Sequence, residues 1–130
     1  MMFIDSSAVV EIILDGEKAD GLLQRLSAAS NHYLGPSVIY ESAVVLATRL
    51  RMEPSTTKLL VKSFIERFEI EVLPASADIA FVAVDAFDRY GKGRHPAKLN
   101  FGDCFSYAGA KAAGAGLLYV GDDFTLTDLA

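Results

Sequence analysis

The chain has 130 residues, of which 52% are hydrophobic and only 22% are charged. This length suits a single domain, residues 1–130, built around one core, and a second domain is not expected. The net charge of −5 argues against a broad basic surface for nucleic acid, although acids gathered in one metal site would account for part of it.

Membrane and secretory segments are not expected either. No apolar run approaches the roughly 18 residues of a membrane span, and residues 1–5 lack the basic and apolar regions of a signal peptide. The single cysteine, Cys104, excludes an internal disulfide and a cysteine-based zinc site. The sequence therefore indicates a cytoplasmic protein that does not associate with a membrane.

The first half of the chain predicts an alternation of short strands and helices. The expected strands cover residues 3–4 and 32–34, and the expected helices cover 8–14, 18–29 and 36–50. Asp5 directly follows the first strand, and Ser6 or Ser7 is expected to cap the helix after it. Glu41 lies in the first turns of the helix that Pro36 opens, where a carboxylate is favoured.

The second half continues the alternation. Helices are expected over 58–68 and 78–90, and strands over 70–73 and 116–120. Between the last two strands, Asn100 is a preferred N-cap for a helix that continues to about Gly114. Asp103 then occupies the third helical position, where its carboxylate meets free N–H groups. The last strand also ends in acids, Asp122 and Asp123.

Strands that alternate with helices predict an α/β fold. The expected sheet is mostly parallel and is covered by helices on both faces. In such sheets ligands bind outside the carboxyl ends of the strands. The acids that follow strands or open helices therefore fall at the edge where a ligand would bind.

Four carboxylates converge at this predicted edge. Asp5 and either Asp122 or Asp123 follow strands, while Glu41 and Asp103 lie near helix starts. Two carboxylates about 4 Å apart repel by roughly 4 kcal/mol at an effective dielectric near 20, so the cluster calls for a cation. Oxygen ligands without His or Cys favour Mg²⁺ or Mn²⁺, and an open site of this kind suits phosphoryl chemistry.

Each acid also has a purely structural interpretation. Asp103 is a good capping acid, Glu41 a good first-turn acid, and Asp122 and Asp123 are common turn residues. Asp5 is the hardest to explain in this way, because it directly follows a buried strand and precedes two small hydroxyl residues. Separate structural roles also do not explain why all these acids fall at one edge.

Four short motifs resemble those of a known family. Residues 3–8, Tyr40-Glu41, residues 100–104 and residues 121–124 stand in the order and spacing of the PIN-domain ribonucleases. Within these, the chain resembles the VapC toxins of the VapBC toxin-antitoxin systems. The resemblance implies a PIN-like three-layer fold, with a mostly parallel central sheet of about four to five strands.

The resemblance also implies a function and a site. RNA would be cut by metal-activated water, the protein would be inhibited by a small VapB-like antitoxin that blocks the site, and it would form a homodimer or a hetero-oligomer with the antitoxin. The implied ligands of Mg²⁺ or Mn²⁺ are Asp5, Glu41, Asp103 and either Asp122 or Asp123, with Ser6, Ser7 and Asn100 in support.

The sequence departs from the family pattern in two places. Many members carry a threonine two residues before the fourth acid, whereas Gly121 stands here, so Asp122 and Asp123 both remain candidates. Relatives commonly continue into a final edge strand, which leaves the expected strand number at four or five.

The basic loop over residues 91–98 fits contacts to RNA phosphates, which position RNA without reading its sequence. The candidates for these contacts are Lys92, Arg94 and Lys98.

Two other function classes fit parts of the sequence. A Mg²⁺-dependent phosphatase or phosphoacceptor of the haloacid-dehalogenase or receiver type also places an Asp after its first strand. Such phosphatases use Asp-x-Asp, however, and Ser7 stands two residues after Asp5. A non-catalytic binding module would use the apolar excess for a partner and the acids only as caps.

Overall fold

The computed structural model describes all 130 residues and contains four strands and six helices. The strands are β1 (Met2–Ile4), β2 (His32–Leu34), β3 (Glu71–Val72) and β4 (Gly116–Leu118). The helices are α1 (Ser6–Ile13), α2 (Ala19–Ala28), α3 (Pro36–Leu50), α4 (Pro54–Arg67), α5 (Ala77–Tyr90) and α6 (Phe101–Ala113). None of these helices is both long enough and apolar enough to cross a bilayer.

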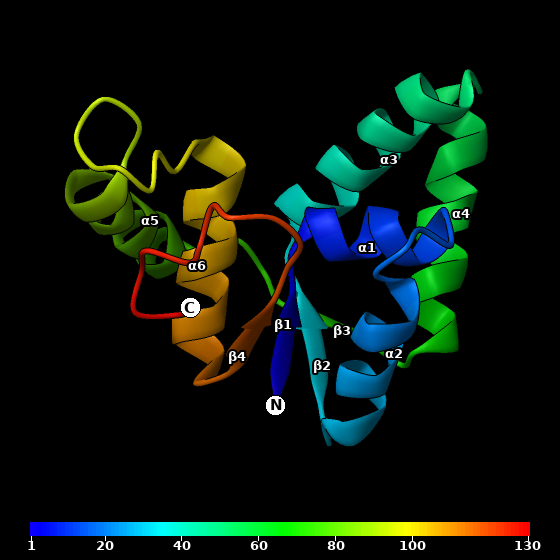
Figure 1. The fold of residues 1–130 in the computed structure, drawn as a ribbon, viewed down its shortest axis with the longest axis horizontal. Coiled ribbons are helices and arrows are strands. Elements are labelled where there is room, and N and C mark those ends of the chain that lie inside the picture. The colour runs from blue at the N-terminus through cyan, green and yellow to red at the C-terminus, as the bar shows by residue number, and fades with distance from the viewer.

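The four strands form one sheet in the order β3-β2-β1-β4, and every neighbouring pair is parallel. Figure 1 shows this sheet between two groups of helices, with α1 to α4 on one side and α5 and α6 on the other. The predicted three-layer α/β fold is thus confirmed. The chain after β4 adds no fifth strand, so the sheet has the lower of the two expected strand numbers.

Two helix starts differ from the prediction. Asp5, and not Ser6 or Ser7, is the N-cap of α1, because its carboxylate accepts a hydrogen bond from the backbone N–H of Ser7. Helix α4 begins at Pro54, four residues before the expected start. Proline is well suited to the first helical position, since its missing N–H would have no partner there.

Helix α6 packs tightly on the centre of the sheet. Phe3 and Ile4 of β1 are almost fully buried, and Ala108 and Ala110 of α6 have no exposed surface. A Cβ atom added to Gly109 would overlap the ring of Phe3. The run of small residues in α6 therefore lets the helix approach β1, and this approach brings the start of α6 close to the end of β1.

This packing predicts a clear cost for one added methyl group. Gly109→Ala should lower the free energy of unfolding by about 1–3 kcal/mol in urea denaturation, because the buried Phe3 ring has no room to move. Gly21→Ala is the matched control, since a Cβ there meets no atom within 4 Å. Stability should be unchanged or raised by up to about 1 kcal/mol in that variant. Equal effects of the two substitutions would contradict the proposed packing.

Candidate active site

The predicted acids lie at the carboxyl edge of the parallel sheet. Asp5 follows β1, Glu41 lies in the second turn of α3, and Asp103 lies in the first turn of α6. Asp122 and Asp123 lie in the segment after β4. Four separate elements thus bring acids to one edge, as the order of strands and helices predicts.

Asp5 is buried and held at both carboxylate oxygens. Its Oδ2 accepts hydrogen bonds from the backbone N–H of Ser7 at 3.1 Å and from the Ser7 hydroxyl at 2.6 Å. Its Oδ1 accepts one from the Ser106 hydroxyl at 2.6 Å. The Ser7 hydroxyl also accepts the backbone N–H of Val120 at 3.0 Å, which ties Asp5 to the chain leaving β4. These donors fix the orientation of the Asp5 carboxylate.

Asp103 is held by a capping box. Its backbone N–H donates to Asn100 Oδ1 at 3.0 Å, and its Oδ2 accepts the backbone N–H of Asn100 at 3.1 Å. The predicted N-cap at Asn100 is therefore confirmed. The other carboxylate oxygen, Oδ1, has no protein donor, so it is available to a ligand at the edge of the sheet.

The charge around Asp103 is unbalanced. Burial, which is the largest cause, and the negative charges of three neighbouring carboxylates together raise the pKa of Asp103 to about 7, against the lowering effect of the Asn100 N–H. These neighbours are Asp123, Asp5 and Glu41. A buried carboxylate surrounded by other carboxylates is a common feature of functional sites, since the fold maintains it at a cost in stability.

Glu41 approaches the first turn of α6 because a glycine lies there. Ser6 donates its hydroxyl to Glu41 Oε1 at 2.6 Å. A Cβ atom added to Gly102 would lie 2.6 Å from Glu41 Oε2. Any larger residue at position 102 would therefore push the Glu41 carboxylate away from Asp103.

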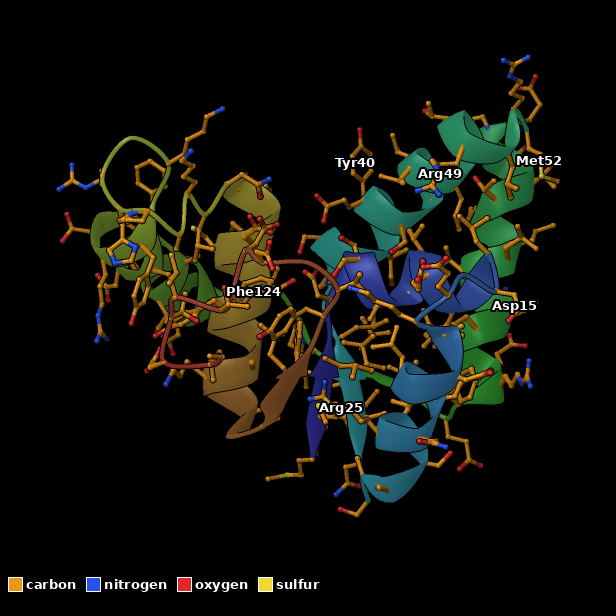
Figure 2. The ribbon with its side chains drawn as sticks, in the orientation of Figure 1. Asp15, Arg25, Tyr40, Arg49, Met52 and Phe124 are labelled. Carbon is orange, nitrogen blue, oxygen red and sulfur yellow. The ribbon has the colours of Figure 1, made fainter.

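One observation favours Asp123 over Asp122 as the fourth acid. Asp123 is among the carboxylates whose negative charge raises the pKa of Asp103. The Asp122 backbone carbonyl accepts hydrogen bonds from Thr125, which makes a local turn. Phe124, which directly follows Asp123, is 1% exposed and anchors the segment (Figure 2). Asp123 is therefore the acid of this segment whose charge is linked to Asp103.

The residues present fit a hard divalent cation. All the converging groups are carboxylates and no His or Cys is among them, which matches the oxygen ligands that Mg²⁺ and Mn²⁺ prefer. No three of these side chains are yet close enough together to hold a metal ion. Hydroxyl and backbone N–H donors occupy the oxygens of Asp5, one oxygen of Glu41 and Oδ2 of Asp103, so a cation would replace some of these hydrogen bonds.

The basic loop between α5 and α6 is only partly available. Arg94 forms an ion pair with Asp88 at 3.0 Å and also donates to the Asp88 backbone carbonyl. Lys92 and Lys98 are exposed and form no ion pair. Of the three predicted phosphate contacts, the two lysines are therefore free, whereas Arg94 already has a partner.

Two residues of the site were not predicted from the sequence. Ser106 has no exposed surface and donates to Asp5, although the two residues are 101 positions apart. Gly102 provides the space for Glu41. The signal for Ser106 was its place three residues after Asp103, which puts both side chains on one face of α6.

The raised pKa of Asp103 predicts a pH-dependent stability in the absence of divalent cations. A carboxyl group with a pKa of about 7 when folded and 3.8 when unfolded binds more protons in the folded state between these values. The free energy of unfolding should therefore fall as the pH rises from about 4 to 7. In urea denaturation across this pH range, the free energy of unfolding should fall less steeply with pH in Asp103→Asn than in the wild type. If the free energy of unfolding depends on pH in the same way in Asp103→Asn and in the wild type, the raised pKa does not belong to Asp103.

Comparisons with known proteins support one family. The PIN domain family matches residues 2–129. A ribonuclease VapC of Mycolicibacterium smegmatis is 42% identical over 99% of this chain and 98% of its own length. A VapC ribonuclease of Rhizobium meliloti is 37% identical over 99% of both chains.

A solved structure supports the fold. The crystal structure of Mycobacterium tuberculosis VapC20, a toxin described as cleaving the sarcin-ricin loop, superposes with a TM-score of 0.73. The match covers 96% of this chain and 93% of that one, at 20% sequence identity. Together with the sequence matches, this likeness shows that the chain belongs to the PIN-domain family and, within it, to the VapC ribonucleases.

Proposed function

We propose that this protein is a Mg²⁺-dependent endoribonuclease and the toxin of a toxin-antitoxin pair in the cytoplasm. It hydrolyses phosphodiester bonds of RNA at the carboxyl edge of its sheet. The observation that carries the proposal is the convergence of carboxylates from four elements on Asp103. We assign the metal-binding role to Asp5, Glu41, Asp103 and Asp123.

The chemistry follows from this donor set. A bound Mg²⁺ or Mn²⁺ would polarise a phosphate oxygen and lower the pKa of an attacking water. Ser7 and Ser106 orient Asp5 through their hydroxyl groups. Asn100 donates to Oδ2 of Asp103, which leaves Oδ1 as the oxygen that would bind the cation.

The surroundings of the site suit RNA. Lys92 and Lys98 lie in the loop that leads into α6, and both are free to contact phosphates on one side of Asp103. Contacts of this kind position a nucleic acid without reading its sequence. Membership of the PIN-domain family leaves a haloacid-dehalogenase or receiver type of phosphatase without support, since the match spans residues 2–129.

An apolar hollow beside the site suits the antitoxin. It has a volume of about 510 Å³, and Tyr40, Val44 and Phe101 line it together with Glu41. Tyr40 and Phe101 are 73% and 75% exposed, and Figure 2 shows Tyr40 projecting from α3 into solvent. Apolar surface of this kind commonly marks a protein interface. An antitoxin segment in this hollow would cover Glu41 and block access to the site.

A second exposed apolar stripe lies on α5. Phe81, Val84 and Phe87 are spaced three residues apart, and each is at least 42% exposed. This spacing places them on one side of the helix. We propose that this stripe contributes to assembly of the protein as a homodimer or as a hetero-oligomer with the antitoxin.

The proposed activity predicts metal-dependent cleavage of RNA. The purified protein, freed of its partner, should cleave RNA when Mg²⁺ or Mn²⁺ is added. Asp5→Asn and Asp103→Asn should each lower the cleavage rate by more than the ~10–100-fold typical of residues that only support a metal site. The rate is measured on labelled RNA at saturating metal.

Two controls make this experiment decisive. Adding an equimolar amount of the cognate VapB-like antitoxin should stop cleavage, which tests the partner. Chelation with EDTA should abolish cleavage by the wild type. Cleavage that survives EDTA, or that persists in Asp5→Asn, would exclude the metal mechanism.

The structure also predicts which of two adjacent acids serves the site. Asp123→Asn should raise the Mg²⁺ concentration for half-maximal cleavage by about tenfold or more, since it removes one negative ligand. Asp122→Asn removes the same charge one residue away and should change this concentration by less than about twofold. A larger effect at Asp122 than at Asp123 would overturn the assignment.

A further inference from the structure

The acid that completes the proposed site lies on a segment without helix or strand. After β4 the chain crosses the carboxyl edge of the sheet and then runs along α6 to the C-terminus (Figure 1). Asp123 is on this segment, residues 119–130, which we call the tail. The position of Asp123 therefore depends on what attaches the tail to the rest of the protein.

The far end of the tail is attached to α6 through Asp128, which contacts Tyr107 and Lys111; we call these contacts the tether. Asp128 Oδ1 accepts a hydrogen bond from the Tyr107 hydroxyl at 2.7 Å, and Oδ2 accepts one from Lys111 Nζ at 2.6 Å. The Tyr90 hydroxyl of α5 donates to Oδ1 at 3.4 Å. The hydrogen bonds from Lys111 and Tyr107 lower the pKa of Asp128, which keeps its carboxylate charged. Burial and the hydrogen bond to Asp128 raise the pKa of Tyr107, so its hydroxyl remains a donor.

The tether and the site share one face of α6. Asp103, Tyr107 and Lys111 follow one another at intervals of four residues, which places their side chains in one row along the helix. At one end of the tail the charge of Asp123 acts on Asp103, and at the other end Asp128 accepts hydrogen bonds from Tyr107 and Lys111. The helix face that carries the Asp103 carboxylate therefore also holds the far end of the tail.

Between these two points the tail is packed and internally bonded. Phe124 is 1% exposed, and its ring lies 5.2 Å from that of Tyr119. The buried Thr127 hydroxyl donates to the Phe124 carbonyl and accepts the backbone N–H of Leu129. A displacement at Asp128 would thus be transmitted through a compact turn to the residue before Phe124, which is Asp123.

We propose that Asp128 is a positioning residue for the metal site. By tying the tail to Tyr107 and Lys111, it holds the Asp123 carboxylate beside Asp103. This inference rests on the proposed function, because it assigns Asp128 a role only through the cation that Asp123 helps to bind. Asp128 does not itself touch the cation or the RNA.

The test is a Mn²⁺ titration of the full-length protein followed by electron paramagnetic resonance. Asp128→Ala should raise the dissociation constant of Mn²⁺ by about tenfold, as expected for loss of a hydrogen bond to a charged group. Tyr107→Phe, which removes only one donor, should shift it in the same direction by a smaller factor. Ser76→Ala, which removes the N-cap hydrogen bond of α5, is the matched control and should leave Mn²⁺ affinity unchanged.

A double-mutant cycle distinguishes positioning from general stability. In an Asp123→Asn background, Asp128→Ala should weaken Mn²⁺ binding no further, because the group that it positions is already lost. A full additional effect in that background would overturn the inference. So would an Asp128→Ala variant that melts at a lower temperature yet binds Mn²⁺ like the wild type. A wild type that neither binds Mn²⁺ nor cleaves RNA would instead overturn the proposed function, and the inference with it.

Discussion

Carboxylates brought together at the carboxyl edge of the sheet repel one another, and the surrounding polar contacts offset that repulsion. Ser7 and Ser106 donate to Asp5, Ser6 donates to Glu41, and the Asn100 backbone donates to Asp103. Even so, burial and the neighbouring charges raise the pKa of Asp103 to about 7. The fold thus maintains a charge imbalance that a divalent cation would relieve.

The rest of the architecture determines how closely these acids approach. Small residues in α6 allow the helix to pack on β1, where Gly109 faces the ring of Phe3. The same packing brings Ser106 to Asp5, while Gly102 leaves space for Glu41 at the first turn. Glycines that make the core compact therefore also determine the geometry of the site. We propose that the tail carries the remaining acid and that its attachment to α6 determines where that acid lies.

Much of this arrangement could be predicted from sequence. Alternating strands and helices placed Asp5, Glu41 and Asp103 at one edge, and Asn100 was a recognisable N-cap. These features depend on local patterns and on the general topology of parallel sheets. Ser106 was not predicted, because a small hydroxyl residue within the apolar run of α6 does not by itself indicate that it contacts Asp5. The choice between Asp122 and Asp123 depends on the path of a tail without regular structure, which no local pattern specifies.

The central claim is that these acids form one cation site, and a crystal structure grown with Mn²⁺ tests it most directly. Anomalous scattering locates Mn²⁺ independently of the protein atoms. We expect one or more Mn²⁺ ions at the carboxyl edge of the sheet, with ligands from Asp5, Glu41, Asp103 and Asp123. A crystal saturated with Mn²⁺ that shows no anomalous peak at this edge would contradict the claim.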